Sequence, residues 1–243
     1  MRIRHVETVA ALCVAACVFA FTVALLAPAG DALARTERGS AGLHFGVQAP
    51  SGDFGKQVDG NGYGGTVEGY WNIGRESPLA IGLRGGYFIY GHDDYKVPLS
   101  PTIPGVWVDV ETNNNLVTGM LLLRLQAWQG DVRPYGEGFL GLNYLYTNTS
   151  VKSEATGATF AESNNFDDTA FLSGLGGGLE IRLASQPRGS VYLDLGVSLV
   201  RGGRARYLTE GDIEVVDNVP VYTVHDSYTN TVLYRIGVMF GFR

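Results

Sequence analysis

The sequence is poor in cysteine and in charge. It has two cysteines, Cys13 and Cys17, and both lie close to the N-terminus. If that end is removed, disulfides, thiolate metal ligands and cysteine nucleophiles are all excluded. Charged residues make up 17% of the chain, against roughly 25% in an average soluble protein. The formal net charge of -6 disfavours nucleic acid as a partner.

The N-terminal segment has the layout of a secretory signal peptide. A basic start, an apolar run and a small-x-small cleavage site follow one another at Arg2–Arg4, Val9–Leu26 and Ala32–Ala34. We predict that residues 1–34 are removed. Residues 35–243 would then form one domain, since β-barrels of about 200–250 residues commonly do.

Two alternatives exist for this segment. Val14-Ala15-Ala16-Cys17 resembles a lipoprotein cleavage box, which would place an acyl anchor on Cys17. The residues after Cys17 are again apolar, where a polar tether would be expected. An uncleaved membrane helix fits less well, because Pro28 and Gly30 break the apolar run directly before the Ala32–Ala34 site.

The rest of the chain alternates with a period of two. From Val232 to Phe242 every second residue is apolar, which indicates a β-strand with one apolar face. Seven earlier segments repeat the pattern, and no helical pattern competes with it. The eight predicted strands are Gly42–Gln48, Tyr63–Ile73, Leu79–Tyr90, Leu116–Trp128, Arg133–Thr147, Phe166–Ala184, Val191–Leu199 and Val232–Phe242.

The connections between these strands alternate in length. Short turns follow the second, fourth and sixth strands, whereas long polar loops follow the others, including His92–Val110, Ser150–Asn165 and Gly202–Pro220. This layout is typical of an eight-stranded antiparallel up-and-down transmembrane β-barrel, with the turns in the periplasm and the loops outside the cell. The sequence therefore predicts an all-β protein of the outer membrane.

The polar face of the strands carries few charges. In a soluble lipocalin-like barrel this face would meet water, and it would need many more charges than it has. An enclosed interior needs few charges, in balanced pairs. We therefore predict that the apolar face meets lipid and that a belt of ion pairs fills the lumen. The residues of this predicted belt are Glu68, Arg84, Arg124, Glu137, Glu180, Arg182, Asp194 and Arg235.

The short turns set the pairing within this belt. If Gln129–Val132 is a four-residue turn, Arg124 falls opposite Glu137, where cross-strand partners interact most strongly. Glu68 can pair with Arg84, and Asp194 with Arg182 or Arg235. Eight strands leave an interior just wide enough for side chains, so the belt would act as a plug.

Aromatic residues on the apolar face fall into two groups. Such girdles mark the two membrane interfaces. The group near the short-turn end is Trp71, Phe240 and Phe242, and the group near the loop end is Tyr87, Tyr144, Tyr146 and Phe171.

Taken together, the chain resembles the small eight-stranded outer-membrane barrels, the OmpA transmembrane-domain and OmpX-like group. The resemblance rests on the signal peptide, the alternating strands, Pro50–Gly55 and the aromatic ending Val238–Phe242. It implies that the last strand is read by the barrel-assembly machinery. Family members usually end in Phe or Trp, whereas this chain ends in Phe242-Arg243.

An enzyme is the alternative function. His225 and Ser227 share a strand face, which is similar to the outer-membrane lipid A deacylases, where His activates Ser. No acid follows in the strand to orient His225, and a triad is recognised by the roles of all its members. Acidic residues in the loops match no calcium loop.

We therefore expect an outer-membrane barrel with a structural, surface-interaction or narrow-pore role, without a catalytic, cofactor or metal site. Its expected partners are outer-membrane lipid and lipopolysaccharide, with the barrel-assembly machinery at the last strand, and it is expected to be a monomer. Arg201, Arg204 and Arg206 lie where the seventh strand leaves the membrane and could meet anionic headgroups. A lipid-modifying enzyme and a secreted soluble ligand-binding barrel are the alternatives.

Overall fold

The structure is a computed structural model, and it describes residues 37–58, 60–74, 77–98, 107–127, 129–153, 159–186, 189–216 and 219–242. The expected signal peptide, its cleavage site and the final Arg243 lie outside the described residues.

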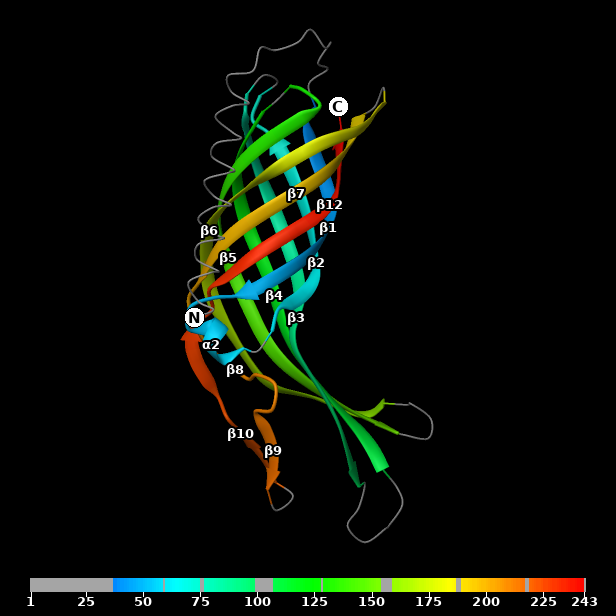
Figure 1. Cartoon of the computed structure of the whole chain (residues 1–243), viewed down its shortest axis with the longest axis vertical. Helices are drawn as coiled ribbons and strands as arrows, with labels where there is room; N and C mark the ends of the chain where they lie inside the picture. The colour runs from blue at the N-terminus through cyan, green and yellow to red at the C-terminus, as the bar shows by residue number, and fades with distance from the viewer. Residues whose placement is uncertain are drawn as a thin grey trace.

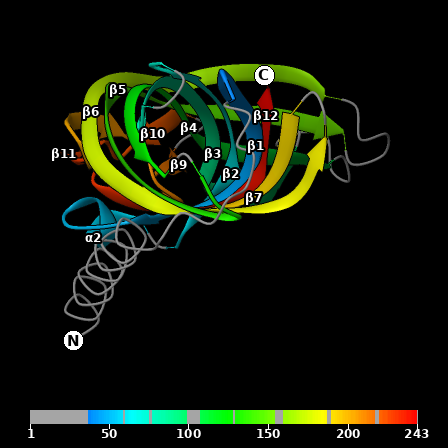
Figure 2. The same ribbon diagram turned by 90° about the horizontal axis from the view of Figure 1, so that it is seen from above.

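Eight antiparallel strands close into one barrel, as the alternation predicted. Around the wall the order is β1-β12-β7-β6-β5-β4-β3-β2, and β1 pairs with both β2 and β12 to close the ring. Figures 1 and 2 show the strands curving round this ring. The strands are β1 (Gly39–Pro50), β2 (Gly62–Asn72), β3 (Leu79–Pro98), β4 (Trp107–Gln126), β5 (Val132–Ser153), β6 (Thr159–Gln186), β7 (Gly189–Gly202) and β12 (Thr231–Phe242).

The apolar face of the strands points outward. Leu43, Leu83 and Leu175 are 67%, 65% and 70% exposed, although each lies in the middle of a well-paired strand. The neighbours of opposite parity, such as His44 and Arg84, are buried in the lumen. A soluble barrel would have the opposite arrangement, so that alternative is wrong. No helix among the described residues is both long enough and apolar enough to cross a membrane.

Three of the segments expected to be loops contain regular strands. β3 and β4 remain paired from Gly91↔Asn114 to Pro98↔Trp107, beyond an irregularity at Ile89, and β5 and β6 remain paired to Lys152↔Thr159. In Figure 1 these hairpins run past the barrel at the end opposite the C-terminus. A polar hairpin outside the membrane has no need of an apolar face, so its sequence carries no alternation to find.

The segment between β7 and β12 also folds. β8 (Arg204–Tyr207) pairs with β11 (His225–Tyr228), and β9 (Ile213–Val216) pairs with β10 (Val219–Tyr222). A single helical turn, α2 (Phe54–Gln57), follows β1, where no helix was expected.

α2 and β8 together cover the loop end of the barrel. The Phe54 ring is 1% exposed. Its centroid lies 5.0 Å from that of Tyr207, edge-on, and 5.8 Å from that of Tyr90. The Tyr90 hydroxyl donates to the carbonyl of Leu208 at 3.1 Å. We call this group, with the buried Val58, the apolar cap.

At the other end the connections are tight. Gly74 and Gly130 have φ of 94° and 98°, a conformation that glycine adopts without the steric cost that other residues incur. These turns fix the register of the hairpins that carry the charged residues.

Candidate functional site

Charged side chains from six strands meet in the lumen near the short turns. The register places Glu68 on β2 opposite Arg84 on β3, and Arg124 on β4 opposite Glu137 on β5. The second pairing is the one that the short turn after β4 predicted. Because side chains alternate along a strand, this register directs all four residues into the lumen.

Three guanidinium groups bridge the carboxylates. Arg84 donates to Glu68 at 2.5 Å and to Glu137 at 2.7 Å. Arg235 on β12 binds the same two carboxylates, at 2.6 and 2.9 Å. Arg124 reaches Glu137 and Glu180 at 3.0 Å each and Glu68 at 3.3 Å. We call these six residues the charged network.

Tyrosine rings hold Arg124 in place. Its guanidinium carbon lies 3.6 Å from the ring centroid of Tyr70 and 3.8 Å from that of Tyr135, within the range of a cation–π interaction. The Tyr70 hydroxyl accepts from Arg124 at 2.6 Å and donates to Glu137 at 3.0 Å. Arg124 is 0% exposed, so water does not compensate its charge.

Because the network is buried, the loss of any one member destabilises the barrel strongly. Removing one partner of a buried ion pair costs about 3–5 kcal/mol, because the other partner keeps its charge without water. Each carboxylate of Glu68 and Glu137 contacts three guanidiniums. The network therefore binds the inner surfaces of β2, β3, β4, β5, β6 and β12 to one another.

Two residues of the predicted belt lie outside the network. Asp194 on β7 is buried, but its ion-pair partner among the described residues is His44, with Nε2 and Oδ2 2.8 Å apart. Arg182 on β6 pairs instead with Asp131 at 3.0 Å, in the turn before β5.

Several interacting residues were missed in the sequence. Besides His44, Tyr70 and Tyr135, Arg133 forms an ion pair with Glu37 at 3.0 Å beside the turns. The strand parity of His44 and Tyr70 was the available signal, since both fall on the polar face of β1 and β2.

The aromatic residues of the outer wall lie at its two ends. Trp71 and Phe242 both pair with Gly39, and their ring centroids are 6.5 Å apart. At the loop end Tyr144 stacks on Tyr146, with centroids 5.4 Å apart. Phe171 and Phe240 are 57% and 53% exposed, and the Tyr87 hydroxyl donates to Asn115 at 2.6 Å.

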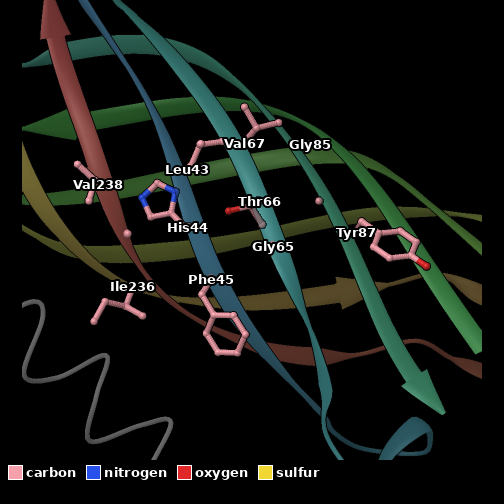
Figure 3. A pocket seen from close by; sticks show the side chains of 12 residues that line it. Leu43, His44, Phe45, Gly65, Thr66, Val67, Gly85, Tyr87, Ile236 and Val238 are labelled. Carbon is pink, nitrogen blue, oxygen red and sulfur yellow. The ribbon is translucent and has the colours of Figure 1, made fainter. Parts of the chain in front are cut away.

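Between these ends the outer wall is hollowed. A groove of about 540 Å³ is lined mainly by apolar side chains and glycines, with His44 and Thr66 also among its lining residues. Figure 3 shows Leu43, Phe45, Val67 and Tyr87 around it, from β1, β2 and β3. Its position on the apolar wall places it against lipid chains.

His225 and Ser227 have different hydrogen-bonding partners. His225 binds Asp212 with Nε2 and Oδ2 3.0 Å apart, an acid upstream of the strand. The Ser227 hydroxyl lies 2.7 Å from that of Tyr207, which itself donates to Gln57 at 2.5 Å. Burial is the main cause that raises the pKa of the Tyr207 phenol above its ordinary value.

The comparison with protein families decides the class of the chain. The model of the outer membrane protein beta-barrel domain matches residues 13–231. The chain belongs to this family. Membership and the exposed apolar wall make it an outer-membrane protein. No match is found among curated proteins.

Solved structures of this outer-membrane class are similar over most of the chain. Neisserial surface protein A has 15% identity and a TM-score of 0.44, with 86% of this chain and 99% of that chain covered. Ail, the attachment invasion locus protein of Yersinia pestis, has 14% identity and a TM-score of 0.39, covering 85% and 99%. The N-terminal barrel of Pseudomonas aeruginosa OprF has 11% identity and a TM-score of 0.36, covering 86% and 100%.

Proposed function

We propose that this outer-membrane barrel is a structural and surface-binding protein whose lumen is closed to solutes. The observation that carries the proposal is the charged network, in which Arg84, Arg124 and Arg235 are buried and bridge three carboxylates across the lumen.

Two levels of closure support this role. The charged network lies near the short turns, and the apolar cap of Phe54, Tyr90 and Tyr207 lies at the loop end. Between them Phe88, Leu116 and other lumen-facing side chains are buried. An interior bounded by eight strands is just wide enough for such side chains, which favours a plug over a channel.

A role in binding would reside in the segments beyond the membrane. The wall is constrained by lipid, whereas the hairpins of β3–β4 and β5–β6 are free to vary and carry polar residues. We propose no catalytic role. The hydroxyl of Ser227 lies 2.7 Å from that of Tyr207 and His225 pairs with Asp212, which supports a structural use of both residues.

We further propose the partners of a monomeric barrel. Anionic headgroups of lipopolysaccharide would meet Arg201, Arg204 and Arg206, all three of which are exposed. Arg204 also pairs with Asp226 at 3.1 Å on the surface. Little free energy is lost when such an exposed ion pair is replaced by a contact with a headgroup. The barrel-assembly machinery would read β12, the strand that closes the ring.

Conductance tests the closed lumen. Purified protein in planar bilayers should give no steady conductance, whereas Arg124→Ala should give measurable openings, because three carboxylates lose a shared partner. Arg182→Ala is the matched control, since it removes an arginine that pairs with Asp131 in a turn. Steady conductance from the unmodified protein, at the level of a porin, would contradict the proposal.

A further inference from the structure

A second cluster of buried ligand atoms lies beside the charged network. His44 on β1, Glu68 on β2 and Asp194 on β7 each offer one ligand atom, and these atoms lie within 4.8 Å of one another. Nε2 of His44 is 2.8 Å from Asp194 Oδ2 and 3.7 Å from Glu68 Oε1. All three side chains are 0% exposed.

The strand register builds this cluster. His44 pairs with Gly237 on β12, and Gly237 pairs with Asp194 on β7. A Cβ at Gly237 would overlap the ring of His44, so this glycine leaves room for the ring to cross β12 towards Asp194. Figure 3 shows that ring on the β12 side of β1. Glu68 lies one step further along the lumen, on β2.

Three polar atoms of the cluster lack a hydrogen bond within the described part of the chain. Among the described residues, Nδ1 and Nε2 of His44 and Oδ1 of Asp194 have no hydrogen-bond partner. The 2.8 Å approach of His44 to Asp194 is therefore close but not aligned as a hydrogen bond. Buried polar groups without a partner are rare, and an unseen ion is one of the standard explanations.

The charge of the lumen also calls for a cation here. Within the described lumen, four guanidiniums (Arg84, Arg124, Arg133, Arg235) face five carboxylates (Glu37, Glu68, Glu137, Glu180, Asp194), which leaves one negative charge when His44 is neutral. Asp194 is the carboxylate of that set whose close contact at 2.8 Å is with His44 rather than with an arginine. The excess charge therefore lies at this cluster.

We propose that His44, Glu68 and Asp194 bind one divalent transition-metal ion, with zinc the ion that fits best. Zinc takes imidazole nitrogen at about 2.0–2.1 Å and carboxylate oxygen at about 2.0–2.2 Å, which sets its ligand atoms roughly 3.4 Å apart in a tetrahedron. The His44–Asp194 pair at 2.8 Å would open slightly, and the wider pairs, within 4.8 Å, would close. Imidazole also selects against magnesium and calcium, which prefer oxygen ligands.

Neighbouring residues hold the ligands in position. The Tyr135 hydroxyl donates to Asp194 at 3.2 Å, and Arg84 and Arg235 bind the Glu68 oxygen that faces away from His44. Such outer contacts orient ligands and raise metal affinity. The pairing of β1 with β12 closes the ring. The ion would join β1 and β2 on one side of this closure to β7 on the other, and would therefore stabilise it.

The test compares metal content and stability in the full-length barrel. Protein refolded into detergent with zinc, then passed over a desalting column, should retain about one ion per chain. With free zinc at about 100 times Kd, the unfolding midpoint should rise by about 5–10 °C. His44→Gln should lower zinc affinity at least tenfold. His92→Gln is the matched control, because His92 is an exposed histidine on the β3 extension, and it should retain the ion.

Cobalt gives a readout that does not need a variant. Cobalt(II) bound to one histidine and two carboxylates should show visible ligand-field bands in the unmodified protein, and zinc should displace them. Absence of these bands, or equal zinc affinity in His44→Gln and the unmodified barrel, would overturn the proposal. A third outcome would also overturn the metal proposal: the barrel binds no metal, and its stability falls as the pH rises only when His44 is present. In that case a proton on His44 would supply the positive charge at the cluster.

Discussion

Replacement of Arg124 by alanine is the sharpest perturbation of the charged network. Arg124 contacts three carboxylates at 3.0–3.3 Å and lies between two tyrosine rings. Its removal takes from Glu180 the ion pair at 3.0 Å and leaves Arg133, opposite on β5, as its cationic neighbour. A buried ion pair that loses one member costs about 3–5 kcal/mol.

This loss in the free energy of unfolding can be measured by thermal unfolding. In a chain of this length each kcal/mol shifts the unfolding midpoint by about 2–4 °C, so Arg124→Ala should lower it by about 6–20 °C. The assay is gel mobility in detergent after incubation at increasing temperature, with tryptophan fluorescence as an independent probe. Arg182→Ala should lower the midpoint far less, because the ion pair of Arg182 with Asp131 is partly exposed.

A double mutant tests the cause. Glu180→Gln removes the charge of the carboxylate that loses its ion pair in Arg124→Ala, so the double variant should be more stable than additivity predicts, by about 0.5–3 kcal/mol. If Arg124→Ala is no less stable than Arg182→Ala, or if the two effects simply add, the reasoning from buried charge is refuted.

Two smaller perturbations test other parts of the wall and the loop. A methyl group at Gly196 would lie 2.7 Å from the Tyr135 hydroxyl, so Gly196→Ala should cost about 1–3 kcal/mol. Gly119→Ala, which places its methyl in open space on the outer wall, should cost less in the same unfolding assay, and equal losses would refute a tightly filled lumen. Beside α2, the hydrogen bond from Lys56 lowers the pKa of Asp53. Lys56→Ala should raise that pKa in an NMR titration. Because the pKa is lowered in the folded state, any stability from this pair is present above the ordinary aspartate pKa and is lost as the pH falls through the lowered value. An unchanged titration would contradict that cause.

The strands and their register were predictable from the sequence because lipid imposes a strict pattern. An apolar outer face makes every second residue informative, so Leu43 and Leu83 identify the wall, and a short turn fixes Arg124 opposite Glu137. Outside the membrane this constraint is absent. The paired extension from Gly91 to Pro98 has polar residues on both faces, a pattern that predicts a loop.

Arg182 shows why parity alone does not place a side chain. It shares a strand face with Glu180, but the pairing of β6 with β7 shifts between Arg182 and Ala184. Its backbone N–H donates to Asp131 at 2.7 Å, and its guanidinium binds the same residue. A β-bulge changes the direction of the side chains next to it. The alternation of apolar and polar residues does not indicate the position of this bulge.

The glycine run on β6 explains how long charged side chains fit in so narrow a barrel. A methyl at Gly178 would lie 2.5 Å from the Tyr135 hydroxyl, and one at Gly176 would lie 3.2 Å from a Glu137 oxygen. Bare backbone on β6 therefore provides the volume that arginine and tyrosine from the other strands occupy. Small barrels fill their interior by setting small residues against large ones. A run that resembles a flexible loop in composition is then part of the wall against which the charged network packs.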